Sequence, residues 1–260
     1  MPSRIDKNIF DDFPVIGSIP SDSLFLTLSN TAEEISFSGQ RQQSCVCFID
    51  MMSSTSITSK LDNAQIGKYY SIFLNAMATI ARNFGSQIIK NAGDCLIYYF
   101  PSTSDSNDRI GFSDVLECCT TMIEAHRFIN AKLNEEALPP VSYRISADYG
   151  MVEIARSITS ATDDLFGSTM NRCAKINSKA KENGMIIGDD LYRVIKSFTS
   201  FDTKYHFEQV SSYSTANGQE YPIYSVQSKE RGIILNPFKR HSVRNPSFVH
   251  ANNEPHMDMK

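Results

Sequence analysis

The spacing of apolar residues predicts short strands and long helices in the first half of the chain. Residues 44–50 (SCVCFID) are almost continuously apolar, which predicts a buried strand. Between residues 62 and 84 apolar positions recur at helical spacing, which predicts one or two helices that end at Gly85. Two β-rich runs on either side of the NAGD turn (residues 91–94) predict a hairpin.

The second half continues the mixture of helices and strands. Residues 111–136 predict a long helix, and residues 142–155 predict one or two strands with a tight connection at Gly150. The next segments predict a polar loop at 155–164, a helix over 166–184 capped by Gly184, a strand at 185–188, a helix at 189–198 with acids at its positive end, and strands at 205–210 and 221–226. The order β-αα-ββ-α-ββ-α-β-α-ββ predicts an α+β fold with one sheet covered by helices mainly on one face.

The composition divides the 260 residues into a core and two extensions. Residues 1–40 are polar and irregular and are interpreted as an N-terminal extension, whereas residues 41–227 hold the predicted elements. Residues 228–260 are poor in apolar residues, so we expect a flexible tail that is either simply solvated or in contact with anionic lipid or nucleic acid. The tail is locally basic through Lys229, Arg231, Lys239, Arg240 and Arg244.

Charge, hydropathy and cysteine usage exclude several classes of protein. A hydrophobic content of 41% with 21% charged residues is typical of a soluble globular protein, and the net charge of −4 argues against general nucleic-acid binding. No apolar stretch is long enough to span a membrane, and the first residues do not resemble a signal peptide. The six cysteines form no CxxC pair, so we expect reduced thiols in a cytoplasmic protein and no structural zinc.

Two aspartates stand at predicted strand ends. Asp50 ends the first strand and is followed by Ser53, Ser54 and Thr55, small residues that let backbone N–H groups approach phosphate oxygens. Asp94 follows the tight turn of the hairpin, and if the hairpin lies beside the first strand the two carboxylates meet at one edge. Clustered carboxylates repel unless a cation or a proton neutralises them, which favours a divalent-metal site. Turn formation at each aspartate is the alternative.

A third segment, residues 164–175 (DLFGSTMNRCAK), also carries candidate chemistry. Asp164 precedes the predicted helix, and Gly167 allows close backbone approach. Asn171 and Lys175 are four residues apart and share one helix face, which offers a neutral hydrogen-bonding group beside a cation. The alternative is the polar face of a surface helix.

Together these segments resemble the class III adenylate/guanylate cyclase catalytic domain over roughly residues 41–226. FIDMMSST (residues 48–55) resembles the first metal strand of the family, KNAGD (90–94) its K-x-x-G-D hairpin, and the 164–175 segment its D-x-x-G-x-x-V-N-x-A-x-R run. The resemblance implies a ferredoxin-like sheet with added elements. It also implies that Asp50 and Asp94 hold two Mg²⁺ or Mn²⁺ ions and that Ser53, Ser54 and Thr55 approach the substrate.

The resemblance further implies roles in reading ATP. Lys90 and Asp164 would recognise adenine, because lysine can donate to ring N1 while aspartate accepts from the 6-amino group. Asn171 would orient the ribose, and Lys175 stands where the family has an arginine that meets charge on the phosphate. The implied reaction is the formation of 3′,5′-cyclic AMP and pyrophosphate by attack of the ribose 3′-hydroxyl on the α-phosphate. In this family the site lies between two domains, so a homodimer with two sites is implied.

Several positions depart from the family pattern. Lysine lacks the planar fork of arginine, so Lys175 loses bidentate phosphate contact; Arg172, three residues away, is either a substitute or a surface residue. Ser53 replaces a usual glycine, which is harmless only if its φ is negative. Asp148 stands where a histidine is frequent, and we favour a structural role for it. These departures leave a degenerate, nucleotide-binding domain as the alternative to a cyclase. A diguanylate cyclase is less consistent, because its GG[DE]EF turn is absent.

Overall fold

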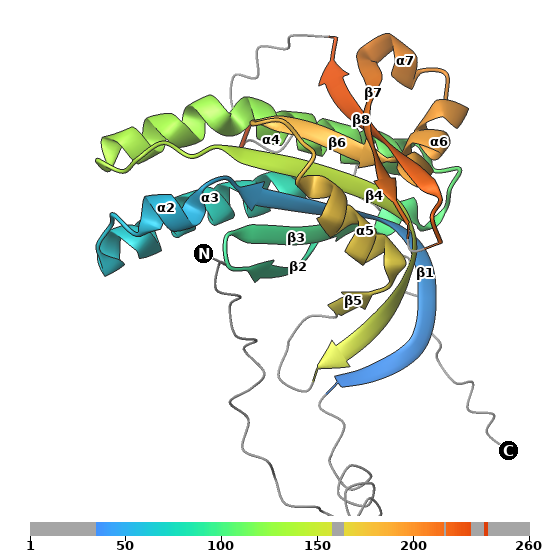
Figure 1. The fold of residues 1–260 in the computed structure, drawn as a ribbon, viewed down its shortest axis with the longest axis horizontal. Helices are drawn as coiled ribbons and strands as arrows, with labels where there is room; N and C mark the ends of the chain where they lie inside the picture. The colour runs from blue at the N-terminus through green and yellow to red at the C-terminus, as the bar shows by residue number, and fades with distance from the viewer. Residues whose placement is uncertain (1–34, 158–163, 216, 230–236, 239–260) are drawn as a thin grey trace, which may run out of the picture.

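A computed structural model describes residues 35–157, 164–215, 217–229 and 237–238 (Figure 1). Most of the predicted helices and strands are present in the predicted order, and the structure adds three short elements that were not predicted, α2, β5 and α7. The elements are β1 (Ile35–Met51), α2 (Ser54–Thr58), α3 (Asn63–Asn83), β2 (Gln87–Ala92), β3 (Cys95–Phe100), the 3₁₀ turn η1 (Pro101–Ser104), α4 (Arg109–Glu135), β4 (Tyr143–Ser157), β5 (Asp164–Phe166), α5 (Ser168–Asn177), β6 (Gly184–Gly188), α6 (Asp189–Ser197), α7 (Phe201–Lys204), β7 (Tyr205–Ser214) and β8 (Glu220–Ser228).

Within the described residues, the strands form one eight-stranded sheet in the order β2-β3-β1-β4-β6-β8-β7, with β5 added beside β4. β4 and β6 run parallel, and the other neighbours are antiparallel. The first four strands and the two long helices α3 and α4 make the β-α-β-β-α-β unit expected of a ferredoxin-like fold. The predicted α+β class is therefore confirmed.

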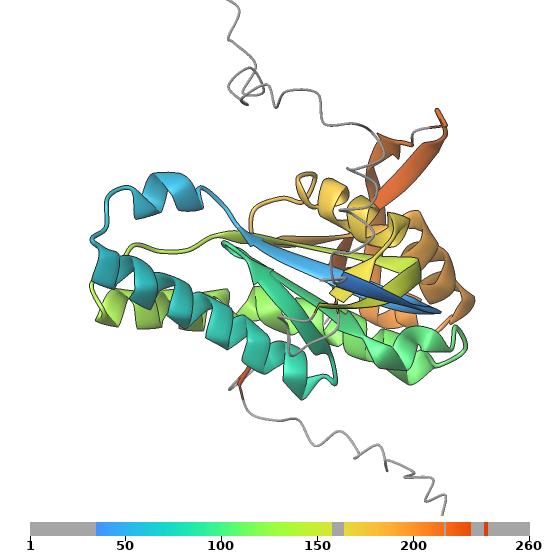
Figure 2. The same cartoon turned by 90° about the horizontal axis from the view of Figure 1, so that it is seen from below.

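Strand alternation gives the sheet two different faces. Cys45, Cys47 and Ile49 of β1 enter the main core under α3 and α4, whereas Val46 and Phe48 point to the other face, where α5 packs. Figure 2 shows α3 and α4 on one side of the sheet and α5 on the opposite side. Helices thus cover mainly one face, as predicted, and Val46 and Phe48 of β1 belong to the α5 face.

β4 is one continuous strand, not two strands joined at Gly150. The strand passes through Gly150 with φ of 154°, and a Cβ there would lie 2.7 Å from Oγ1 of Thr169 on α5. Glycine is needed for the close approach of α5 to the sheet, and not for a turn. β4 also runs to Ser157, beyond the start of the predicted loop, whose residues 158–163 lie outside the described residues.

The helix predicted over 166–184 ends early, at Asn177. The Asn177 side chain turns into the sheet, where Nδ2 donates to the carbonyl of Phe48 at 3.3 Å and to Oγ of Ser146 at 3.1 Å. Asn183 takes the left-handed conformation, with φ of 51°, and its Oδ1 accepts from the backbone N–H of Tyr143 at 3.2 Å. Gly184 therefore opens β6 and does not cap a helix.

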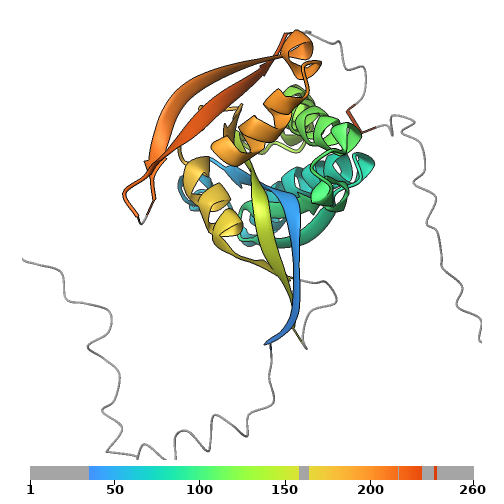
Figure 3. The same ribbon diagram turned by 90° about the vertical axis from the view of Figure 1, so that its right-hand side faces the viewer.

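The two extensions are described only in part. β1 begins at Ile35, within the predicted N-terminal extension, and with β4 it forms a long arm beside the rest of the sheet (Figure 3). Residues 1–34, 230–236 and 239–260, which include most of the predicted tail, lie outside the described residues. No helix in the described part of the chain combines the length and the apolar character needed to cross a membrane. All six cysteines are free, and five are buried, as predicted for reduced thiols.

Candidate active site

The first element of the site is a pair of aspartates at neighbouring strand ends. Asp50 lies opposite Cys95 in the β1–β3 register, so Asp94 is adjacent to it, and the backbone N–H of Met51 donates to the carbonyl of Asp94 at 3.4 Å. The hairpin therefore lies beside the first strand, which is the condition under which the two carboxylates meet. Ser54, buried at the start of α2, donates its hydroxyl to Oδ2 of Asp94.

A cation that sequence reasoning did not single out faces Asp50. Arg144 lies directly opposite it on β4, and its Nη2 donates to Oδ2 of Asp50 at 2.9 Å. Partial burial raises the pKa of Asp50, the Arg144 hydrogen bond opposes this rise, and the charge of Asp94 adds to it. Because the charge of Asp94 acts on Asp50, the two carboxylates form an electrostatically coupled pair that a cation would stabilise.

Beside Asp50 the surface is hollowed. A pocket of about 320 Å³ is lined by Asp50 and Arg144 from the sheet, by Ala174 and Asn177 from the last turn of α5, and by Ser178, which follows that helix. The exposed fraction of the Asp50 side chain is 27%, so its carboxylate is accessible from this pocket. The pocket gives a phosphate or an ion space to reach the carboxylate.

The second element of the site joins β2 to β5. Lys90 Nζ and Asp164 Oδ2 lie 2.5 Å apart, with exposed side-chain fractions of 49% and 26%. Asp164 Oδ1 also accepts from the backbone N–H of Leu165 at 2.9 Å, which fixes the carboxylate at the start of β5. The structure thus brings together two predicted substrate-binding residues that are 74 positions apart.

The third element is the exposed face of α5. Asn171 and Lys175 are both exposed, and Lys175 Nζ donates to the hydroxyl of Tyr213 on β7 at 3.0 Å. Ala174 and Asn177 line the pocket at Asp50, whereas Lys175 turns the other way, towards β7. Within one chain, the predicted metal ligands and the predicted phosphate cation therefore do not face one another.

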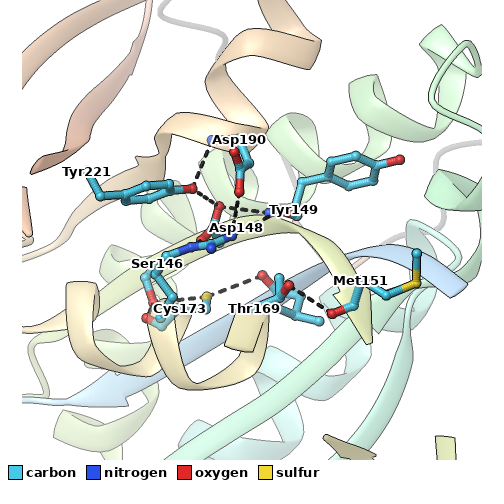
Figure 4. A network of polar contacts seen from close by, with 10 residues as sticks. Ser146, Asp148, Tyr149, Met151, Thr169, Cys173, Asp190 and Tyr221 are labelled. Atoms are coloured by element: carbon cyan, nitrogen blue, oxygen red, sulfur yellow. Dashed lines mark hydrogen bonds and ion pairs between the residues drawn. The ribbon is translucent and has the colours of Figure 1, made fainter. Parts of the chain in front are cut away.

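A buried polar network holds α5 to the sheet (Figure 4). Asp148 is fully buried and accepts from Arg172 Nε at 2.6 Å, from the Tyr221 hydroxyl at 2.8 Å and from the backbone N–H of Tyr149 at 2.9 Å. Arg172 also donates through Nη2 to Asp190 at 2.6 Å. Burial raises the pKa of Asp148 to about 6, against the opposing effects of Arg172, Tyr221 and Tyr149.

This network decides two points left open by the sequence. The structural interpretation of Asp148 is correct, because all its partners are internal. Arg172 is not available as a substitute for the family arginine, because two carboxylates hold its guanidinium. Of the two cations considered for that position, only Lys175 is not held by carboxylates.

Comparison with known proteins identifies the family. The adenylate and guanylate cyclase catalytic domain matches residues 38–228, which is most of the chain. The chain belongs to this family. A curated relative, the photoactivated adenylate cyclase subunit beta of Euglena longa, is 25% identical over 192 residues, covering 71% of this chain and 22% of the relative. This cyclase domain therefore spans only about a fifth of the length of the curated relatives it matches.

Solved structures agree on the fold of the cyclase domain. The adenylyl cyclase CyaB from P. aeruginosa aligns with a TM-score of 0.64 at 18% identity, covering 74% of this chain and 97% of that structure. The guanylyl cyclase Cya2 aligns with a TM-score of 0.64 at 18% identity, covering 72% of this chain and 93% of that structure. Since both adenylyl and guanylyl cyclases share the fold, the fold does not determine whether the substrate nucleotide carries adenine or guanine.

The cyclase family implies divalent metal ions, and the aspartate pair fits them. Among the described residues no group of three or more His, Cys, Asp or Glu side chains could hold an ion. Mg²⁺, however, is usually bound by one or two carboxylates, with waters and substrate phosphates as the other ligands. Asp50 opens into a pocket and Asp94 is adjacent to it in the β1–β3 register, so two carboxylates form a donor set that suits an ion arriving with a nucleotide.

Ser53, just before α2, occupies the position where the cyclase family usually has glycine, and its backbone conformation is one that favours glycine. Ser53 has φ of 57°, in the left-handed region that favours glycine. The replacement of glycine by serine would be free of strain only with a negative φ, so it carries a conformational cost here. Ser54 is buried against Asp94, and Thr55 is exposed.

Proposed function

We propose that this cyclase domain converts ATP to 3′,5′-cyclic AMP and pyrophosphate at a site shared by two copies of the chain. The observation that carries the choice of ATP is the Lys90–Asp164 pair, which places a cationic donor beside an anionic acceptor at 2.5 Å. Adenine presents an acceptor at N1 and a donor at the 6-amino group, which complements this pair. Guanine presents the reverse polarity at these positions, so Asp164 would face its 6-oxo group.

The direction of Lys175 supports a site made by two chains. In one chain, Lys175 turns towards β7, while Asp50 opens into the pocket on the other side of α5. A second copy could bring its Lys90, Asp164, Asn171 and Lys175 to a nucleotide held at Asp50 and Asp94. A neighbouring guanylyl cyclase domain of Blastocladiella emersonii, which aligns here with a TM-score of 0.61 at 16% identity, is described as a non-canonical dimer, and the same domain is also described as a monomer. These neighbours therefore do not supply the arrangement of the proposed dimer, which rests on the direction of Lys175.

In the proposed reaction, the ribose 3′-oxygen displaces pyrophosphate from the α-phosphorus. Divalent ions, Mg²⁺ or Mn²⁺, would supply Lewis-acid activation of the 3′-hydroxyl and charge neutralisation when bound. Asp50 and Asp94 would hold these ions at the strand ends, and Ser54 fixes the Asp94 side chain through its hydroxyl. Asn171 would orient the ribose, and Lys175 would stabilise charge that develops on the phosphates.

Purified protein incubated with Mn²⁺ and either ATP or GTP tests this proposal. We expect cyclic AMP as the main product, and we expect Asp50→Ala to abolish it while Asp202→Ala, at an exposed position of α7, does not. Absence of product from the wild type with either nucleotide would contradict the proposed activity. Full activity of Asp50→Ala would contradict the metal assignment.

The choice of base has its own test. Lys90→Glu combined with Asp164→Cys should raise the use of GTP relative to ATP, because it removes the donor–acceptor order that suits adenine. The matched control is Lys196→Glu with Asp202→Cys, since Lys196 and Asp202 form another exposed ion pair at 2.5 Å, away from the proposed site. An unchanged GTP-to-ATP ratio in the first double variant would refute the purine assignment.

One observation favours a second candidate function, nucleotide binding without turnover. The arginine position holds only Lys175, and Arg172 is engaged elsewhere. A chain that binds ATP with Mn²⁺ but forms no cyclic nucleotide at high protein concentration would support this candidate. We also propose a cytoplasmic location, which the free and mostly buried thiols support.

A further inference from the structure

The β7–β8 hairpin places two tyrosines against two cations of α5. Tyr213 and Tyr221 are direct partners across the two strands, and Arg172 and Lys175 are three residues apart on the helix. The Arg172 guanidinium lies 4.4 Å from the centroid of the Tyr221 ring, and the Lys175 ammonium lies 5.5 Å from that of Tyr213. Figure 3 shows the hairpin curving past α5. Each tyrosine ring therefore contacts one of the two cations.

The hydroxyl of Tyr221 is fully used inside the protein. It donates to Asp148 at 2.8 Å and accepts from the backbone N–H of Asp190 at 2.8 Å. The residue is buried, and burial raises the pKa of its phenol well above the usual range. Tyr221 is thus part of the network that holds α5.

The hydroxyl of Tyr213 is different, because it is half-buried and has a hydrogen to give. It accepts from Lys175 Nζ at 3.0 Å, and within the described part of the chain its own O–H has no acceptor. The ring is fixed by packing on an apolar cluster that includes Ile176, Ala180 and Ile223. A rigid ring therefore presents a free O–H donor beside an exposed ammonium.

We propose that Tyr213 is a further catalytic residue, which together with Lys175 offers two adjacent donors to the phosphates of the nucleotide. This inference rests on the proposed function. Arginine gives phosphate two parallel N–H donors from one planar group, whereas lysine is a single point charge. The Lys175 ammonium and the Tyr213 O–H, with their heavy atoms 3.0 Å apart, replace that fork with two side chains. The ammonium also polarises the phenol and strengthens its donation.

Turnover of Tyr213→Phe tests the donor, since this variant keeps the ring and removes only the hydroxyl. We expect kcat with ATP and Mn²⁺ to fall on the order of tenfold and KM to rise only about threefold, because a donor to developing charge acts more strongly in the transition state than on the bound substrate. Tyr224→Phe is the matched control, on the same hairpin but with its hydroxyl directed to Asp189. A kcat for Tyr213→Phe within twofold of wild type would overturn the proposal.

A double-mutant cycle separates the proposed role from a structural one. With Lys175→Arg, the arginine supplies both donors, so adding Tyr213→Phe should change kcat by less than about twofold. A merely structural tyrosine would cost the same factor in both backgrounds. Equal losses in the two backgrounds would therefore overturn the proposal.

A binding measurement keeps this inference distinct from the proposed activity. An ATP analogue with a methylene group between the α- and β-phosphorus cannot release pyrophosphate, so its affinity with Mn²⁺ is measurable without turnover. We expect Tyr213→Phe to weaken its binding about threefold and Tyr224→Phe to leave it unchanged. If the wild type forms no cyclic nucleotide, the proposed activity fails, but this loss of affinity would still support the Tyr213 contact. Equal affinity of wild type and Tyr213→Phe would overturn the contact whether or not the wild type turns over.

Discussion

Gly188→Ala should damage the cyclase domain more than its small size indicates. Gly188 is the last residue of β6, and a Cβ there would lie 2.4 Å from Oδ1 and 2.6 Å from Cγ of Asp148. Atoms this close cannot coexist, so one side must move. Asp148 resists movement, because Arg172, Tyr221 and the backbone of Tyr149 all hydrogen-bond to it and it is fully buried.

The expected cost follows from two contributions. Forcing an extra methyl group into a packed interior costs typically about 1–3 kcal/mol. Displacing Asp148 also weakens its hydrogen bond from Arg172, and bonds to charged groups contribute about 1.5–3 kcal/mol each. We therefore expect Gly188→Ala to lower the free energy of unfolding by about 3–5 kcal/mol. We also expect it to reduce the proposed cyclase activity, because the shifted Arg172 belongs to the helix that carries Asn171 and Lys175.

Urea denaturation at neutral pH measures this cost directly. Gly67→Ala is the matched control: it makes the same change within α3, where a Cβ meets nothing within 4 Å. Alanine is the better helix former by about 1 kcal/mol, so the control should be slightly stabilised. The sharper test is non-additivity. In an Asp148→Ala background the clash is gone, so adding Gly188→Ala should cost less than about 1 kcal/mol. A full cost in that background would refute the argument that Asp148 is the obstacle.

Two further predictions concern stability. Asp148 has an ordinary pKa of 3.8 that burial raises to about 6, so the folded chain holds this proton more tightly than the unfolded chain. The stability that Asp148 contributes through this proton is fully present below pH 3.8 and is lost as the pH rises through about 6, by roughly 3 kcal/mol in total. Urea denaturation across this pH range should therefore show the difference in unfolding free energy between wild type and Asp148→Ala shrinking as the pH rises. A difference that stays constant with pH would contradict this prediction. Ser53→Gly should raise the free energy of unfolding by about 1 kcal/mol, because glycine adopts a positive φ without strain. Asn183→Gly should lower it instead, because Asn183, at φ of 51°, also accepts a hydrogen bond from the backbone of Tyr143. A Ser53→Gly variant less stable than the wild type would show that the strain argument is wrong.

Helices and turns that are bounded by capping residues or by glycines with positive φ could be predicted from local signals in the sequence. Asp62 forms a capping box with Gln65 at the start of α3, and Gly85 follows its end with φ of 78°. Gly93, with φ of 62°, makes the turn that places Asp94 directly before β3. Because these signals lie within a few residues of one another, the candidate metal ligands could be placed from sequence.

Contacts between distant strands could not be predicted in this way. Arg144 faces Asp50 only because β1 and β4 pair in one register, and the two residues are 94 positions apart. The end of α5 was missed for a related reason. Residues 178–183 are compatible with a helix, but hydrogen bonds from Asn177 to the sheet and from Tyr143 to Asn183 favour a turn. Tertiary contacts of this kind override weak helix propensity.

The same register explains why one aspartate on this face is a candidate metal ligand and another is not. Along β1, Val46 lies opposite Asp148 and Asp50 lies opposite Arg144, so both carboxylates belong to the face that α5 partly covers. An ionised carboxylate has about four lone-pair sites. Asp148 accepts from three donors, is fully buried and is closed off by Gly188, so it has no room for an ion. Asp50 accepts from Arg144 and opens into a pocket, so it keeps both the lone pairs and the access that a cation with a triphosphate requires.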